Sequence, residues 1–142
     1  MNIADLIPHQ DAMCLLERVL AWDAQHLIAR TATHRDPAHP LLGTTGLRAI
    51  HLSEYGAQAA ALHGGLHAHA RGETAPPGLL VALRDVRLRR VFIHDLPGEI
   101  EIEVQLLLAG AGGRQYSFEA RHAGEVLAAG RLAVMRPGSP AK

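Results

Sequence analysis

Glu54 is the acidic residue whose surroundings in this sequence best suit acid–base chemistry. It precedes the small and apolar run at residues 55–62, YGAQAAAL, which is typical of a helix packed inside a protein. If that helix is central, apolar surface would enclose the carboxyl group, and burial raises the pKa of a carboxylic acid. A glutamic acid that keeps its proton near neutral pH can act as a general acid. The alternative is that Glu54 is exposed, or only hydrogen-bonded to Gln58 four residues later.

Histidines supply candidate bases, and the chain has ten of them. His51 lies three residues before Glu54, so both would share nearly the same helix face, and His51 is a candidate base. Three further histidines follow at helical spacing, but a zinc site needs three or four ligands supported by further hydrogen bonds, and their segment contains two glycines. We therefore expect solvated or capping histidines and no metal at His63, His67 and His69.

Composition bounds the function. The 142 residues fit one domain, residues 1–142, and their 14 basic and 14 acidic residues cancel. With only 4% aromatic residues, neither a basic surface nor a stacking platform for nucleic acid is expected. No run approaches a membrane span, so we expect a cytoplasmic protein. The one cysteine, Cys14, reads as a small buried hydrophobe.

Other catalytic motifs are missing from the sequence. It contains no Gly-x-Ser-x-Gly elbow, no dinucleotide-binding glycine motif and no P-loop. We therefore expect chemistry by acids and bases, without a cofactor.

The elements that must position Glu54 form an α+β pattern. One long helix is predicted at residues 45–67, with a turn-rich loop before it and another at residues 71–77. Strands are predicted at residues 13–23, 26–33, 78–92, 99–109, 114–122 and 125–136, with a short helical turn at residues 6–7 and a frayed tail from residue 137. Glutamates alternate with apolar residues at 99–106, as in a sheet with one buried face. An antiparallel sheet wrapped around one central helix satisfies this order, and its open edge favours a homodimer.

Three segments resemble the motifs of the hotdog-fold 3-hydroxyacyl-[acyl-carrier-protein] dehydratases, in the same order. Residues 6–19, LIPHQDAMCLLERV, resemble the opening motif of that family, and residues 54–59, EYGAQA, resemble its helix motif E.MAQA. Residues 86–99, VRLRRVFIHDLPGE, resemble its basic strand ending in PGD. The resemblance implies a hotdog fold and the conversion of 3-hydroxyacyl thioesters to trans-2-enoyl thioesters. The implied partner is an acyl carrier protein that carries the substrate on phosphopantetheine.

The loop ahead of the helix departs from the usual family pattern. Residues 39–49, HPLLGTTGLRA, stand in place of an HFPG loop and are more similar to the divergent dehydratases of aryl-polyene and related pigment pathways. Arg48 stands where that pattern has proline, and His51 where it has a hydrophobic or small residue. The resemblance implies His39 as the base and Glu54 as the acid.

The same resemblance suggests further residues of the site. A backbone N–H near Gly43 or Gly46, or at the helix start, could hold the thioester oxygen as negative charge develops there. His51 and Gln58 are expected to line the substrate site. A docking surface for the acidic carrier protein is expected at Arg87, Arg89 and Arg90, with a merely solvated strand face as the alternative.

Two other functions remain open at this point. A hotdog acyl thioesterase would use the helix carboxylate to activate water against the thioester carbonyl. A non-catalytic subunit would instead complete a second hotdog chain in a hetero-oligomer, which the altered loop favours.

Overall fold

The chain folds into one sheet and one long helix. The computed structural model describes residue 3, residues 13–73 and residues 80–135. The predicted turn at residues 6–7 and the predicted tail from residue 137 lie outside these described residues. The elements are β1 (Arg18–Trp22), β2 (His26–Thr31), the 3-10 turns η3 (Thr33–Arg35) and η4 (Ala49–His51), α1 (Leu52–Ala70), β3 (Leu80–Leu88), β4 (Ile100–Gly110), β5 (Gly113–His122) and β6 (Glu125–Met135).

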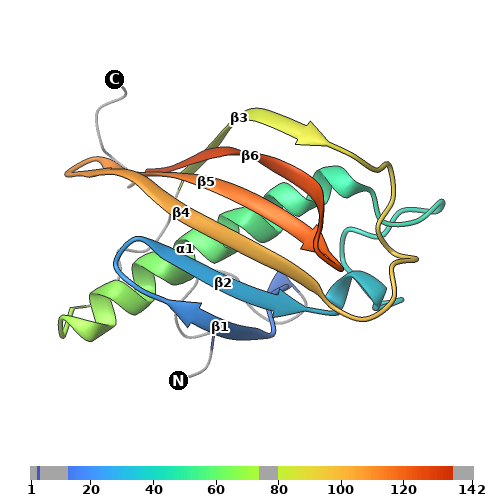
Figure 1. Cartoon of the computed structure of the whole chain (residues 1–142), viewed down its shortest axis with the longest axis horizontal. Coiled ribbons are helices and arrows are strands. Elements are labelled where there is room, and N and C mark those ends of the chain that lie inside the picture. The colour runs from blue at the N-terminus through green and yellow to red at the C-terminus, as the bar shows by residue number, and fades with distance from the viewer. Residues whose placement is uncertain (1–2, 4–12, 74–79, 136–142) are drawn as a thin grey trace.

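The six strands form a single sheet in the order β1-β2-β4-β5-β6-β3, with all neighbours antiparallel. Figure 1 shows α1 lying along one face of this sheet, behind β4 and β5. The predicted α+β arrangement, an antiparallel sheet around one long helix, is confirmed. Among the described residues, no helix combines the length and apolar character needed to cross a membrane.

Alternation in β4 and β5 decides which face of the sheet meets α1. In β4, the side chains of Ile100, Ile102 and Val104 are fully buried, and the glutamates between them lie on the other face. There Arg121 of β5 donates hydrogen bonds to three carboxylates at 2.6 to 2.8 Å, those of Glu101, Glu103 and Glu119. The outer face is therefore charged and internally paired, while the inner face forms the core.

The helix is enclosed on nearly all sides. Residues 55–63 are all buried, which is unusual for a helix of a small domain because most such helices bury only one stripe. Small residues allow this close packing. The ring of Phe118 on β5 fills the space beside Gly56, where an added Cβ would lie 2.8 Å from the ring, and beside Gly130, where it would lie 2.9 Å away.

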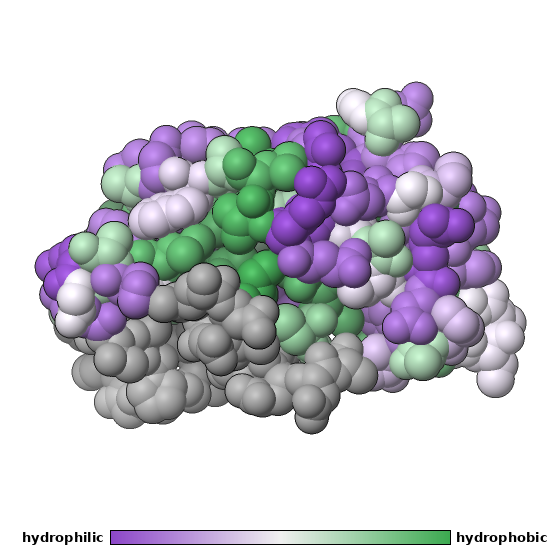
Figure 2. Space-filling view, turned by 90° about the horizontal axis from the view of Figure 1, so that it is seen from below, coloured by the Kyte–Doolittle hydropathy of each residue, from purple (hydrophilic) through white to green (hydrophobic). Residues whose placement is uncertain are grey.

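The sheet ends in an open edge that carries apolar side chains. Among the described residues, β3 pairs with β6 alone. Leu83 and Leu88 of β3 are 45% and 42% exposed, and Val91 just beyond it is 64% exposed. On the face drawn in Figure 2, apolar residues also gather in a band between hydrophilic ones. An unpaired edge with apolar side chains suits pairing with a second chain, and homodimerisation stays a prediction.

Several predicted boundaries were wrong, and two of them share a cause. The helix begins at Leu52 and not at residue 45, because residues 47–49 pair with residues 91–93 and the 3-10 turn η4 follows. For the same reason, β3 ends at Leu88 and not at residue 92. The first strand begins at Arg18 and not at residue 13. The helix ends at Ala70 and not at residue 67.

Two glycines of α1 provide a matched test of the packing. An added Cβ at Gly64 has no atom closer than 3.7 Å, so Gly64→Ala should raise the free energy of unfolding by about 0.5–1 kcal/mol through helix propensity. Gly56→Ala gains the same helix propensity, but its added Cβ overpacks against Phe118. Its free energy of unfolding should therefore be about 1–3 kcal/mol below that of Gly64→Ala. Urea denaturation measures both. Equal stability of the two variants would show that Phe118 does not fix the helix position.

Candidate active site

A short contact between two loops fixes the start of α1. Residues 47–49 and 91–93 exchange main-chain hydrogen bonds of 2.7 and 2.9 Å, and the guanidinium of Arg48 lies 5.7 Å from the centre of the Phe92 ring. The 3-10 turn η4 follows directly and leads into the first turn of α1. This turn carries Glu54. The position of Glu54 is thus tied, through η4 and residues 47–49, to the segment that follows β3.

Glu54 is half-buried and is oriented by Gln58. The Gln58 amide donates to Glu54 Oε1 at 3.3 Å and to the Met13 carbonyl, and its oxygen accepts from the Leu15 N–H at 2.8 Å. Gln58 is fully buried, and both of its N–H groups have protein partners. These hydrogen bonds let Gln58 hold Glu54 in place, and the expected substrate contact of Gln58 stays a prediction. The hydrogen bond between Glu54 and Gln58, one of the two sequence alternatives, is present, although Glu54 is not fully enclosed within one chain.

His39 is buried, and both of its ring nitrogens have partners. Its side chain is only 6% exposed. The Leu41 N–H donates to Nδ1 at 3.0 Å, and Nε2 lies 3.0 Å from the hydroxyl oxygen of Tyr55. The Tyr55 hydroxyl also lies 2.9 Å from Thr33 Oγ1. The partners of His39 are therefore Leu41 and Tyr55, and its predicted role as the base stays a prediction.

Burial and neighbouring charge keep the His39 ring neutral. Burial lowers the pKa of His39, the nearby His51 lowers it further, and Asp36 opposes this shift. His51 is half-buried in η4, three residues before Glu54, and stays a candidate base.

Gly43 and Gly46 close a two-residue turn instead of offering free N–H groups. The Gly43 N–H donates to the Gly46 carbonyl at 3.1 Å, and the Gly46 N–H donates to the Gly43 carbonyl at 3.3 Å. The N–H groups of these two glycines are thus paired with each other, and the expectation that a backbone N–H near them, or at the helix start, holds the thioester oxygen stays a prediction. Gly46 is needed for another reason, since its φ is +129° and an added Cβ would lie 2.1 Å from the His94 ring.

The three arginines of the predicted docking surface lie on two different surfaces. Arg89 and Arg90 join Arg48 around an open groove of about 400 Å³, whose apolar lining comes from Ile50, Leu88 and Val91. Arg90 also pairs with Asp95 at 3.4 Å. This groove lies directly beside the loop contact that leads into α1.

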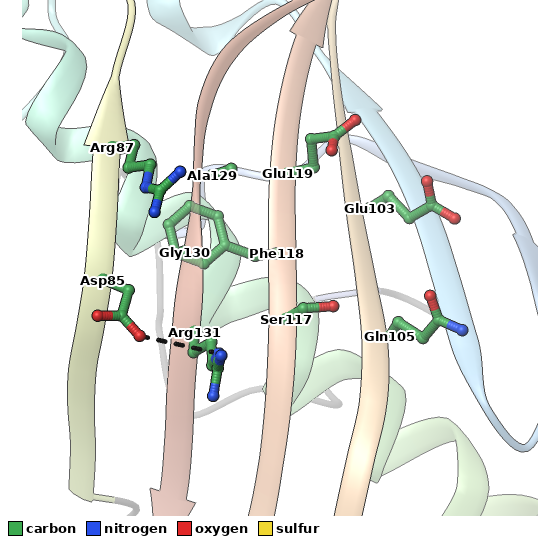
Figure 3. Close-up of a pocket in the computed structure, with 10 residues that line it drawn as sticks. All are labelled: Asp85, Arg87, Glu103, Gln105, Ser117, Phe118, Glu119, Ala129, Gly130 and Arg131. Atoms are coloured by element: carbon green, nitrogen blue, oxygen red, sulfur yellow. Dashed lines mark ion pairs between the residues drawn. The ribbon is translucent and has the colours of Figure 1, made fainter.

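Arg87 lies instead over the outer face of the sheet. It lines a separate pocket of about 370 Å³. Figure 3 shows Arg87 and the Arg131–Asp85 ion pair, of 3.9 Å, on one side of this pocket, and Glu103 and Glu119 on the other. Three carboxylates, those of Asp85, Glu103 and Glu119, outnumber the two guanidinium groups around this pocket, so it is less suited to an acidic partner than the groove beside Arg89.

The histidines at the end of α1 serve the fold. His63 is fully buried, donates from Nε2 to the Asp23 carbonyl at 2.8 Å, and accepts from the Tyr116 hydroxyl at 2.8 Å. Burial lowers the pKa of His63. His67 contacts Arg114 at 3.3 Å. In the part of the chain that the structure describes, no group of three or more side chains could hold a metal ion.

The sequence reasoning missed Tyr55 and Thr33. Tyr55 follows Glu54 directly and is fully buried, and burial raises the pKa of its hydroxyl to about 12. A signal was available, because the hydroxyl of a tyrosine inside an alanine-rich buried helix must find a hydrogen-bond partner. Which partner it finds depends on the path of the loop around His39, and the sequence pattern does not give that path.

Comparison with solved structures shows the same fold in other proteins. A chain of the dehydratase heterocomplex ApeI:P from Xenorhabdus doucetiae is 27% identical and superposes with a TM-score of 0.86, covering 97% of this chain and 92% of that chain. An HP0420 homologue from Helicobacter felis is 12% identical with a TM-score of 0.65, covering 99% and 90%. A putative thioesterase from Ralstonia eutropha JMP134 is 13% identical with a TM-score of 0.58, covering 83% of each chain. The last two similarities concern the fold alone.

Comparison with protein families gives a match over the whole length. A search of curated protein sequences found no match. The model of the ApeP-like family, described as ApeP dehydratase, matches residues 1–142. The hotdog fold predicted from the sequence motifs is confirmed, as is the resemblance to the dehydratases of aryl-polyene pathways. This chain, with its half-buried Glu54 at the start of a central helix, belongs to the ApeP-like dehydratase family.

Proposed function

We propose that this chain is a subunit of a dehydratase that removes water from 3-hydroxyacyl groups held as thioesters on an acyl carrier protein. A base removes a proton from the carbon beside the thioester carbonyl. An acid protonates the departing 3-hydroxyl group, water leaves, and a trans-2-enoyl thioester remains. Membership of the ApeP-like family supports the dehydratase class. The residues of this chain support the assignment of the acid.

The placement of Glu54 is the observation that carries the proposal. Its carboxyl group lies in the first turn of α1 and is half-buried. One oxygen is held by Gln58, whose amide is itself fixed by the main chain of residues 13–15. A general acid must be held in a fixed position and yet be reachable by the substrate, and Glu54 meets both conditions.

The base of the reaction is a histidine, since its ordinary pKa lies near working pH. His39 is the candidate that the family pattern implies, and His51 is the candidate that lies three residues from Glu54. The heterocomplex of the related ApeI:P protein supports a third source, a histidine of a second hotdog chain.

Replacing Glu54 tests the acid directly. Glu54→Gln keeps the shape of the side chain and its contact with Gln58 but removes the carboxyl proton, so dehydration should fall by roughly 100-fold or more. The readout is mass spectrometry of the carrier-bound acyl chain, which separates the enoyl product from the free thiol that a thioesterase would release.

Glu73→Gln is the matched control, because Glu73 lies beyond the other end of α1 and pairs with Arg71 on the surface. It should keep full activity. If Glu54→Gln remains fully active, the proposed mechanism fails. Release of free thiol in place of an enoyl product would favour the thioesterase alternative.

A second hotdog chain is the proposed partner of the open edge at β3. The apolar side chains of Leu83 and Leu88 there suit a sheet that continues into another chain. The engaged ring nitrogens of His39 favour a partner that differs from this chain, because such a partner could supply the base. The alternative remains a homodimer in which each site draws on both copies.

Sedimentation of the chain alone, and of the chain co-expressed with a second hotdog dehydratase, distinguishes these assemblies. We expect a dimer in both samples, with dehydration only in the mixed sample if the partner supplies the base. Full activity of the homodimer would assign base and acid to this chain. A monodisperse monomer in both samples at micromolar concentration would contradict a site shared between chains.

The groove beside Arg89 is the proposed docking position for the carrier protein. Complementary charge raises the association rate with an acidic partner, and salt weakens the effect. Arg89→Glu should slow turnover of the carrier-bound substrate by about tenfold, while turnover of a small thioester analogue should change little. Arg87→Glu, on the outer face, is the comparison and should have the smaller effect. Equal losses on both substrates, or a larger effect at Arg87, would refute docking at the groove.

A further inference from the structure

A chain of hydrogen bonds joins the His39 loop to the buried side of α1. Tyr55 is at its centre, with His39 Nε2 at 3.0 Å on one side and Thr33 Oγ1 at 2.9 Å on the other. The Thr33 hydroxyl also lies 2.7 Å from the Leu15 carbonyl. The rings of His39 and Tyr55 are stacked, with centroids 6.1 Å apart and planes 29° from parallel. The dehydration mechanism assigns no role to Tyr55.

The Leu41 end of this chain determines the direction of the hydrogen bonds around Tyr55. A main-chain N–H can only donate, so Nδ1 of His39 must accept from Leu41, and the proton of the neutral ring must be on Nε2. Nε2–H therefore donates to Tyr55, and the Tyr55 hydroxyl donates to Thr33. The Thr33 hydroxyl is then left to donate to the Leu15 carbonyl at 2.7 Å, beside Thr31 Oγ1 at 3.0 Å.

The reverse arrangement is unfavourable. A base that takes a proton at Nε2 needs a bare nitrogen there, which places the ring proton on Nδ1. That proton would point at the Leu41 N–H, and two donors would face each other in a buried site. Protonation of the whole ring meets the same obstacle.

We propose that the Leu41 N–H fixes His39 in the Nε2-protonated tautomer and that Tyr55 is the positioning residue that accepts from Nε2–H, so that His39 of this chain donates a hydrogen bond and does not remove the substrate proton. The claim that His39 does not remove the substrate proton rests on the proposed dehydratase function, whereas the claim about the tautomer concerns the ring alone. If both claims hold, the base of the Glu54 site is His51 or a histidine of the second hotdog chain.

The chain contains a matched control in a second buried pair, Tyr116 and His63. Here the direction is opposite, because His63 Nε2–H donates to the Asp23 carbonyl and the Tyr116 hydroxyl donates to Nδ1. Tyr116→Phe removes a hydroxyl group from an equally buried tyrosine without touching His39. Tyr116→Phe should therefore change the stability of the protein about as much as Tyr55→Phe does, but it should not change the His39 ring.

Nitrogen-15 NMR of the imidazole side chains tests the tautomer without any need for activity. In the wild-type chain at neutral pH, His39 should show a protonated Nε2 and a bare Nδ1. Tyr55→Phe should shift the Nε2 signal of His39, which loses its hydrogen-bond acceptor, while the ring stays protonated on Nε2 because the Leu41 N–H still faces Nδ1. Tyr116→Phe should move only the signals of His63. A wild-type ring protonated on Nδ1, or His39 signals unchanged by Tyr55→Phe, would overturn the proposal.

Activity then tests what His39 does. His39→Gln keeps an N–H donor but has no titrating nitrogen, so a donor role predicts activity within about tenfold of wild type, while His39→Ala is weaker. A base role predicts that both variants lose roughly 100-fold or more. That result, with the Nε2 tautomer intact, would overturn only the claim that His39 does not remove the substrate proton. Loss of dehydratase activity in every sample, wild type included, would instead count against the proposed function.

Discussion

An enclosed helix constrains everything else in this protein. Because residues 55–63 of α1 are all buried, each polar side chain in that stretch must find a hydrogen-bond partner inside the protein. Gln58 binds the main chain of residues 13–15, Tyr55 binds His39, and His63 binds the turn after β1. Three otherwise irregular segments are thereby attached at fixed positions along the helix. The helix is a framework for the loops as well as the centre of the core.

This constraint also divides the polar residues between fold and chemistry. The fully buried polar side chains of α1 bond to the main chain and to side chains of the loops around it, and so fix the neighbouring residues. Glu54 lies one helical turn before Gln58, in the first turn of the helix, and is only half-buried. A carboxylate beside such a network is well positioned and still accessible, which is the combination that the proposed acid catalysis needs.

The sequence predicts the periodic parts of this structure well and the loops poorly. Alternation of glutamates and apolar residues after Glu99 predicted β4, and the glycines before β5 and β6 marked the turns, because a half-buried sheet imposes a period of two. The start of the helix was misplaced because residues 47–49 pair with a distant segment, which no local pattern reveals. The partners of His39 were missed for the same reason. Motif resemblance supplied Glu54 and the fold, but the hydrogen-bond state of a histidine depends on three-dimensional contacts.

The roles of Glu54 and His39 would be tested by a structure of this chain in complex with a second hotdog subunit and a 3-hydroxyacyl thioester analogue. We expect the Glu54 carboxyl group to lie about 2.6–3.2 Å from the 3-hydroxyl group of the analogue. We also expect His39 Nε2 to stay on the Tyr55 hydroxyl, with another histidine facing the carbon beside the thioester carbonyl. A 3-hydroxyl group bound away from Glu54, with His39 of this chain turned out of its pocket onto that carbon, would contradict both roles.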